Sequence, residues 1–393
     1  MAQDPASFEQ LKSFTGLIHR QPMFSKQSME VERYHLSFLN LNGELLDNDS
    51  EVPSFICDLP DIVTTLNHQP SALLSMPDSW QEALISSSGL TPYLSLESYH
   101  APLHTQYQQQ LASRPFQLNQ TMDTKTILLD LARINIDELS EQQLQDWLMQ
   151  HHMICAMNVN NAQLYHQCKN LSLTLLQGDF YTQPDPDEHQ QISPATQTLM
   201  NILVMLQDPD IEADDLAQAI NKDISLSYKL LKLINSAFFG LPKQVETTSQ
   251  AVVMLGFKKI KIWASLLCLS DMDDKPNEVR IAAMTRARMC ELLAKYYKGQ
   301  SELFFTVGLF SALDALLDKP IEKIVNELPL SNEVKSALVS FDGTAGSALK
   351  DTLNYEHGDW LKVSDSPIPK QILSRLYLES IQWSKQLDSQ LHH

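Results

Sequence analysis

The 393-residue sequence contains no apolar run of the roughly 18 or more residues that a membrane-spanning helix needs. Its first residues, Met-Ala-Gln-Asp-Pro, lack the basic segment and the apolar stretch of a signal peptide. The five cysteines include no Cys-x-x-Cys pair, which disfavours disulfides and a structural zinc site. These absences predict a cytoplasmic protein with reduced thiols, no membrane contact and no bound cofactor.

Basic residues are scarce in the first half of the chain. Up to residue 190 there are 8 Lys and Arg against 23 Asp and Glu, a net charge of −15, and the remainder contributes −4 to the total of −19. An acidic surface repels phosphate backbones, so nucleic acid is not an expected partner. The second half carries a modest basic cluster, which is either a solvated helix face or an anion or partner site: Lys229, Lys232, Lys258, Lys259 and Lys261.

What is present is an ordinary globular composition, 43% hydrophobic, long enough for two to three domains. A polar stretch with two prolines, residues 183–192, is typical of a linker. We therefore predict a first domain over residues 1–185, a linker over 186–192 and a second domain over 193–393.

The first domain has short apolar runs whose later members recur about every 20 residues, as in alternating strands and helices. Between two of them, Ser140–Gln150 has a serine cap and an amphipathic pattern that predict a helix. The pattern predicts an α/β domain, either a parallel (β/α) barrel or a doubly wound sheet. The expected strands are Tyr34–Leu39, Leu73–Ser75, Tyr93–Leu96, Phe116–Leu118, Leu131–Ile136, Ile154–Val159 and Leu173–Leu176.

Three phrases of this domain resemble the EAL family of cyclic-di-GMP phosphodiesterases: Arg20-Gln-Pro-Met-Phe24, Tyr34-His-Leu-Ser-Phe38 and Gln177-Gly-Asp-Phe-Tyr181. The resemblance implies a TIM-like barrel, shortened here because it spans only about 185 residues. In that family, strand-end carboxylates hold two metal ions that activate water.

The positions that match those metal-binding and phosphate-binding residues are mostly neutral in this chain. They are His35, Leu39, Ser75 or Met76, Ser95, Asn119, Gln120, Arg133, Asn135, Met157 and Asn160. The resemblance therefore implies no catalytic residues and no metal site. Gln21 and Gln177 match the family, and with Arg133 they are candidates for binding intact cyclic-di-GMP.

Two histidine pairs were weighed as zinc ligands, His100 with His104 and His151 with His152. Pro102 disfavours a helix through the first pair, and adjacent histidines on an extended chain point to opposite faces. Neither pair has a cysteine or carboxylate at ligand spacing, so we expect surface histidines.

From Ser193 the pattern becomes helical. The first expected helix begins at the Ser193-Pro194 cap, has an apolar stripe from Leu199 to Leu206 and ends at Asp208-Pro209. Further helices are expected at Ala213–Asn221, at Ser225–Ser236, on both sides of Leu255-Gly256, and at Glu278–Tyr297, Leu303–Leu317, Ile321–Glu327 and Lys370–Gln390. The phrases Leu206–Asp210, Lys222–Leu226, Leu233–Gly240 and Gln250–Gly256 resemble the HDOD family, an all-α signalling domain related to HD phosphohydrolases. The His-Asp metal pair of those enzymes falls on Ser311 and Ala312, so a metal centre is not expected.

Phe238 and Phe239 are either core aromatics or, with Lys258, Lys259 and Lys261, part of a partner-docking surface. The order of the two domains resembles bacterial EAL-HDOD tandem proteins. This implies a non-enzymatic protein that controls motility, biofilm formation or cyclic-di-GMP turnover by contacting other cyclic-di-GMP enzymes or response regulators. The alternatives are a cyclic-di-GMP receptor and a metal-dependent phosphodiesterase, and a homo-oligomer is a further possibility.

Overall fold

The computed structural model describes residues 6–68, 71–87, 93–96, 131–150, 153–185, 194–208, 210–241, 243–271 and 275–391. The chain forms two compact units. The sheet unit comprises Asp4–Phe180 and Tyr355–Arg375, and the helical unit comprises Tyr181–Asn354 and Leu376–His393. The division lies near the predicted boundary at residue 185, but Tyr355–Arg375, predicted within the second domain, groups with the first. The predicted linker over 186–192 lies outside the described residues.

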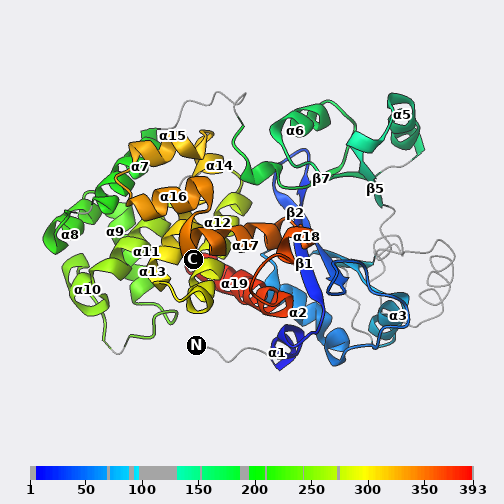
Figure 1. Ribbon diagram of the computed structural model, residues 1–393, viewed down its shortest axis with the longest axis horizontal. Helices are drawn as coiled ribbons and strands as arrows, with labels where there is room; N and C mark the ends of the chain where they lie inside the picture. Colours follow the sequence, from blue (N-terminus) through cyan, green and yellow to red (C-terminus); the bar gives the residue numbers. More distant parts are fainter. Residues whose placement is uncertain are drawn as a thin grey trace, which may run out of the picture. The chain divides into compact units, whose positions relative to one another are not determined.

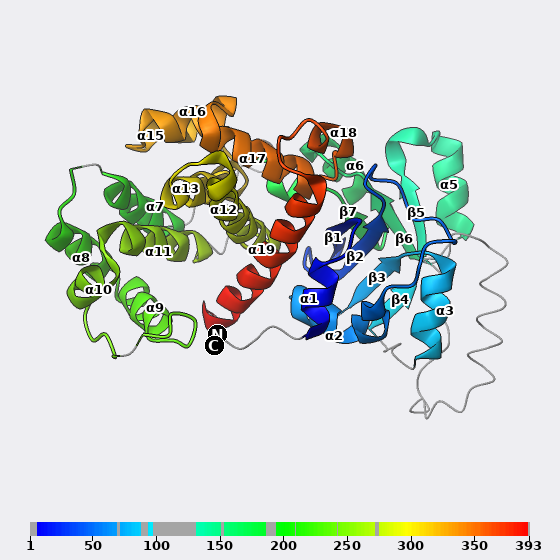
Figure 2. The same cartoon turned by 60° about the horizontal axis from the view of Figure 1, so that its bottom comes forward.

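The sheet unit contains an α/β half-barrel sheet in the strand order β4-β3-β2-β1-β7-β6-β5 (Figure 2). Its described strands are β1 Leu17–Ser25, β2 Val31–Leu39, β3 Ala72–Ser75, β4 Leu94–Leu96, β5 Leu131–Asn135, β6 Met153–Met157 and β7 Leu175–Gln177. The edge strands β4 and β5 flank residues 97–130. The predicted strand at 116–118, the positions Asn119 and Gln120, and the pair His100 and His104 lie outside the described residues, as do His151 and His152.

The sheet differs in one respect from an all-parallel barrel. Strand β1 runs antiparallel to both β2 and β7, whereas β2-β3-β4 and β5-β6-β7 pair in parallel. Only residues 26–30 separate β1 from β2, and a connection this short can join only antiparallel neighbours.

Helices and an aromatic core complete the sheet unit. The α-helices are α1 Ala6–Lys12, α2 Leu59–Leu66, α3 Asp78–Ser86, α5 Glu141–Gln150, α6 Ala162–Lys169 and α18 Trp360–Val363, with 3₁₀ turns at Ser54–Asp58 and Ile136–Glu138. The predicted helix at 140–150 is confirmed as α5. The rings of Phe14, Phe38, Phe55 and Trp80 cluster with centroids 5.6–6.2 Å apart, mostly edge to face, and so bury a large apolar area.

The helical unit consists of helices throughout its described part (Figure 1). They are α7 Pro194–Gln207, α8 Ala213–Asn221, α9 Ile224–Ile234, α10 Thr248–Leu255, α11 Phe257–Ser270, α12 Asn277–Tyr297, α13 Ser301–Phe310, α14 Leu313–Leu317, α15 Ile321–Glu327, α16 Asn332–Ser340, α17 Gly343–Glu356 and α19 Lys370–Leu391. The Asp223 carboxylate accepts from the Leu226 amide at 2.9 Å, which explains why α9 begins there. The single helix predicted over Leu303–Leu317 is interrupted at Ser311-Ala312. Within the described ranges, no helix combines the length and apolar character needed to cross a membrane.

Candidate functional site

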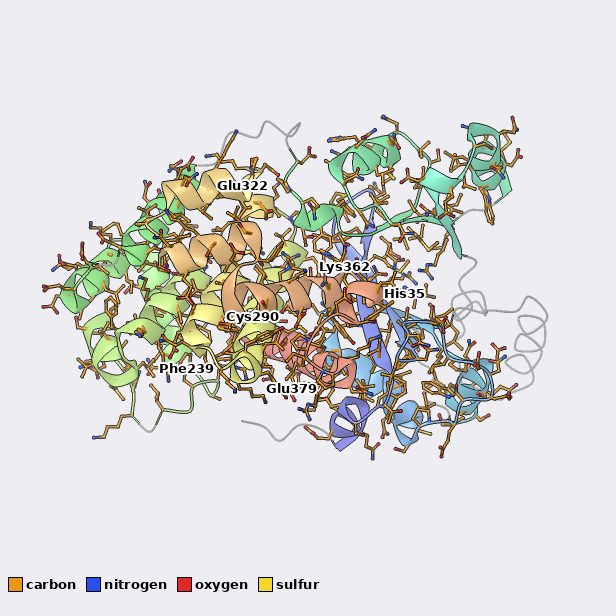
Figure 3. All side chains as sticks on the ribbon, in the orientation of Figure 1. His35, Phe239, Cys290, Glu322, Lys362 and Glu379 are labelled. Atoms are coloured by element: carbon orange, nitrogen blue, oxygen red, sulfur yellow. The ribbon has the colours of Figure 1, made fainter. Side chains whose placement is uncertain are left out.

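A buried polar cluster centred on His35 lies across the sheet. His35 on β2 is opposite Gln21 on β1, while Arg133 comes from β5 and Gln177 ends β7. Gln177 Nε2 lies 3.1 Å from His35 Nδ1 and donates to Gln21 Oε1 at 2.6 Å. Arg133 Nη2 lies 3.3 Å from both His35 Nδ1 and Gln177 Oε1. The structure thus brings together all three residues predicted to bind a nucleotide, next to His35, which is labelled in Figure 3.

The hydrogen-bond donors in this cluster determine the tautomer of His35. Arg133 and the Gln177 amide nitrogen can only donate, and both face Nδ1, so Nδ1 must be the acceptor. The ring proton is then on Nε2 and is donated to Ser75 Oγ, 2.6 Å away on β3. The 3.4 Å approach of Arg133 Nη1 to Nε2 is a contact and not a hydrogen bond in this arrangement. His35 is therefore a neutral imidazole that joins four strands.

Among the described residues that form these bonds, Arg133 is the one cation and none is a carboxylate. His35 is 5% exposed and Gln177 is 2% exposed, so both are largely shielded from solvent. Asn135, which matches a metal-binding position of the EAL family, donates instead to Glu138 Oε1 at 2.7 Å. Asn160 accepts from the Asp179 amide at 3.1 Å. Among the described residues, no group of three or more His, Cys, Asp or Glu is placed to hold a metal ion.

The Gln-Gly-Asp-Phe phrase after β7 forms a tight backbone junction. A Cβ on Gly178 would lie 2.3 Å from the Val159 carbonyl oxygen, a distance that no other residue tolerates. Val159 donates to Gln177 O at 3.1 Å and accepts from Phe180 N at 3.0 Å. The phrase therefore fixes the end of β7, and with it Gln177, beside the strand that follows β6.

The return segment, Tyr355–Arg375, packs on β1 inside the sheet unit. Tyr355 Oη donates to the Ile18 carbonyl at 3.0 Å, and His19 Nε2 donates to the Glu356 carbonyl at 3.0 Å. The Trp360 ring lies 5.3 Å from that of His19. Burial lowers the pKa of His19 from 6.5 to about 4, although the bond to Glu356 opposes the shift. His19 is thus a neutral donor that holds the return segment at neutral pH.

The helical unit carries a buried arginine beside Ser311 and Ala312, the two positions that match the His-Asp pair of HD enzymes. Arg286 on α12 is 2% exposed and donates to the Ser311 carbonyl at 3.3 Å. Asp314, just beyond, accepts from the Ala315 amide at 2.8 Å. Burial raises the pKa of Asp314, and the nearby Arg286 partly offsets this. A guanidinium here repels dications, and Ser311 and Ala312 cannot replace histidine and aspartate as ligands.

Phe238 and Phe239 are half-buried and belong to a cluster of five aromatic rings, called the five-ring cluster below. It also contains Trp263 on α11, Phe305 on α13 and Trp383 on α19, with ring centroids 5.0–6.3 Å apart. Figure 3 labels Phe239 at this position. The cluster joins three helices of the unit, as the core interpretation predicted; its partly exposed edges leave the docking interpretation open.

The three predicted contact lysines differ in their surroundings. Lys258 and Lys259 are exposed in the first turn of α11, whereas Lys261 is half-buried. Burial lowers the pKa of Lys261, opposed in part by Asp208. The side chains of Lys258 and Lys261 line a cavity to which Lys259 does not contribute.

Sequence reasoning missed two features of these sites. His35 was identified only as a residue that replaces a ligand, and its bonds to Ser75, Arg133 and Gln177 join residues far apart in the chain. The contacts of Tyr355 and Trp360 with β1 join residues more than 300 positions apart in the chain. Neither feature has a local spacing that could have predicted it.

Comparison with known proteins identifies one domain in the second half of the chain. Residues 192–319 match the HDOD domain family. Over 208 residues the chain is 33% identical to the cyclic di-GMP phosphodiesterase CdgJ of Vibrio cholerae, covering 52% of this chain and 48% of CdgJ. It is 30% identical over 239 residues to the uncharacterized protein YuxH of Bacillus subtilis, covering 59% of this chain and 58% of YuxH. The chain thus contains an HDOD domain and is homologous to CdgJ, and it spans about half the length of these curated relatives.

A solved structure of an HDOD domain protein with unknown function from Geobacter sulfurreducens is also similar. It is 12% identical, and the match covers 52% of this chain and 95% of that chain. The TM-score is 0.36, which is too low to support an argument about the fold.

Proposed function

We propose that this chain is a non-enzymatic bacterial signal-transduction protein, in which an HDOD domain acts through protein contacts and a degenerate EAL-like barrel serves as its structural partner. The observation that carries the proposal is the cluster around His35. At the strand ends where an EAL phosphodiesterase needs carboxylates, this chain has a neutral imidazole bonded to Ser75, Arg133 and Gln177.

The charge of the side chains around His35 supports this proposal. Two dications about 4 Å apart need several anionic oxygens to offset their mutual repulsion. The His35 cluster instead supplies a guanidinium, two amides and hydroxyls, which attract anions or bond to one another. Arg286 has the same consequence at the matching position of the HDOD domain, since it places a cation where a metal-dependent phosphohydrolase needs a ligand.

The rival interpretation is an enzyme, because CdgJ is named a cyclic di-GMP phosphodiesterase. That name describes CdgJ, and the alignment covers 48% of CdgJ. Incubation of the full chain with cyclic-di-GMP and Mn²⁺ or Mg²⁺, followed by product analysis, separates the two. We expect intact nucleotide; linear product that disappears when a chelator is added would overturn the proposal.

A second candidate is a cyclic-di-GMP receptor that binds without hydrolysis. Gln21, Arg133 and Gln177 converge within one bonded cluster, and a guanidinium is the side chain best suited to grip a phosphate. Titration calorimetry with cyclic-di-GMP tests this candidate. Binding that is lost in Arg133→Met and kept in Arg33→Met would favour the receptor, whereas no heat in the wild-type chain would reject it.

The partner class follows from the same proposal. The resemblance to EAL-HDOD tandem proteins points to other cyclic-di-GMP enzymes or response regulators in the cytoplasm, with motility or biofilm formation as the output. Affinity capture from the native host, with partners identified by mass spectrometry, tests this. Recovery of such a signalling protein is expected, and a consistent partner of an unrelated class would contradict it.

A further inference from the structure

A cavity of about 460 Å³ lies within the helical unit between α7, α11, α13 and α16. This volume is within the usual range of small-molecule sites, about 300–1,000 Å³. The lining includes Gln207, Lys261, Ser265, Leu309, Phe310 and Leu330. It is distinct from the His35 cluster, from the Arg286 position and from the five-ring cluster.

One wall of the cavity is apolar and well ordered by packing. Leu309 and Phe310 on α13 are 2% and 0% exposed, and Leu330 and Val334 near the start of α16 are 8% and 6% exposed. Such a wall suits the hydrocarbon or aromatic body of a small molecule, because the molecule would remove apolar surface from water on both sides.

The part of the lining that comes from α7 and α11 carries polar groups and a cation. Gln207 and Ser265 are 8% and 2% exposed, and Gln207 Nε2 donates to Ser265 Oγ at 3.0 Å. Ser265 Oγ in turn donates to the Lys261 carbonyl at 2.9 Å, one turn earlier on α11. These bonds fix both side chains, so the cavity has a preorganised polar floor.

Lys261 is the charged group most suited to bind a ligand here. Its ammonium forms no ion pair within the described chain, and Asp208 acts on it only as a more distant charge. Burial lowers its pKa, which means that the surroundings leave the charge incompletely stabilised. An anionic group from a ligand would supply the missing partner. Lys258 lines the same cavity, and with Glu302 opposite, the lining keeps a net positive charge.

From this arrangement we infer that the cavity binds a small organic acid, whose carboxylate pairs with Lys261 and whose apolar body packs on Leu309, Phe310 and Leu330. The carboxylate would pair with the cation of the lining, and the apolar body would cover its buried apolar side chains. Neither inorganic phosphate nor a neutral alcohol matches both. The inference does not depend on the proposed signalling role or on cyclic-di-GMP.

Octanoate is a suitable probe, with octanol as the uncharged molecule of equal length and acetate as the same headgroup without the body. We expect calorimetry with the full chain to detect octanoate binding that octanol and acetate do not reproduce. Lys261→Met removes the cation and keeps the packing, and we expect it to raise the Kd for octanoate by at least about tenfold. Lys259→Met, a neighbouring lysine on α11 outside the cavity, should leave the Kd unchanged.

A second variant tests the cavity itself. Thr306→Phe places a ring in the space between the two walls, and we expect it to abolish octanoate binding while the helical circular dichroism of the chain is retained. No octanoate binding to the wild-type chain would overturn the inference. Equal affinities for Lys261→Met and Lys259→Met would also overturn it, as would octanol binding as tightly as octanoate.

Discussion

At the scale of single residues, His35 shows how a polar side chain is held in the interior of the sheet unit. Its imidazole is bonded to side chains from β1, β3, β5 and β7 either directly or through Gln177. The imidazole and its partners stabilise the fold only together. Removing the imidazole leaves the buried donors and acceptors around it unsatisfied.

His35→Ala should therefore destabilise the sheet unit by about 2 kcal/mol, since Ser75, Arg133 and Gln177 lose their shared partner. Hydrogen exchange read by mass spectrometry on β1 and β2 peptides measures the effect locally, without assuming that both units unfold together. Gln163→Ala, an exposed position on α6, is the matched control. Unchanged protection of β1 and β2 in His35→Ala would contradict a structural role for the cluster.

His19 makes the return segment sensitive to pH. The folded pKa of about 4 lies below the unfolded value of 6.5, so the unfolded state binds more protons between these values. The stabilisation by neutral His19 is complete above about pH 6.5 and is lost as the pH falls toward 4. From the size of the shift it amounts to about 3 kcal/mol.

Exchange protection of β1 and of Tyr355–Arg375 should accordingly fall between about pH 6.5 and pH 4, once corrected for intrinsic exchange rates. His19→Phe keeps a ring against Trp360 and removes the titration, so its corrected protection should vary less with pH. A wild-type profile as flat as that of His19→Phe would rule out this assignment.

At the scale of elements, the return segment depends on a turn that only glycine fits. Gly358 has φ +70° and a Cβ there would lie 2.8 Å from His19 Cε1. Gly343 has a similar φ of +73° but open space around it. Comparing alanine at the two positions separates backbone strain from the clash with His19.

We expect Gly343→Ala to cost about 1 kcal/mol from backbone strain alone and Gly358→Ala to cost clearly more. Limited proteolysis with peptide mapping gives the measurement, because a loosened return segment is cut faster within residues 357–369. Equal cleavage rates there in the two variants would show that Gly358 is not held against His19.

The elements also show what could be predicted from the sequence. Strands β2–β7 and α5 were predicted because their apolar runs and caps are local signals, and the helices of the HDOD domain followed from their 3.6-residue period. Strand β1 and its antiparallel direction were not predicted. The break between α13 and α14 was missed, because both helices continue one apolar pattern across Ser311-Ala312.

The sequence predicted which residues form the His35 cluster, but it did not predict the hydrogen bonds between them. Gln21, Arg133 and Gln177 were identified by resemblance, and the structure brings them together around His35. Gln177 can bridge Gln21 and His35 because of the register of β1 with β2 and β7. The hydrophobic periodicity of the sequence does not predict that register. The cavity beside Lys261 likewise depends on how α11, α13 and α16 pack.

At the scale of the whole molecule, the proposed function requires a partner-binding surface on the helical unit. Charge reversal at Lys258, Lys259 and Lys261 should leave the fold intact, because two of these lysines are exposed and none makes an ion pair within the described chain. If they form the partner surface, the triple variant should capture much less partner from host lysate at low salt. Charge reversal at Lys323 and Lys335, elsewhere on the helical unit, is the control. Unchanged capture by the triple variant would reject this surface as the contact site.

The central claim is that the EAL-like sheet performs no hydrolysis, and product analysis of cyclic-di-GMP with the full chain tests it most directly. The nucleotide is incubated with Mn²⁺ and an excess of protein, with and without chelator, beside an active EAL phosphodiesterase as positive control. We expect intact nucleotide from the wild-type chain and also from His35→Glu, because one restored carboxylate cannot hold two metals. Chelator-sensitive formation of linear dinucleotide by the wild-type chain would contradict the account.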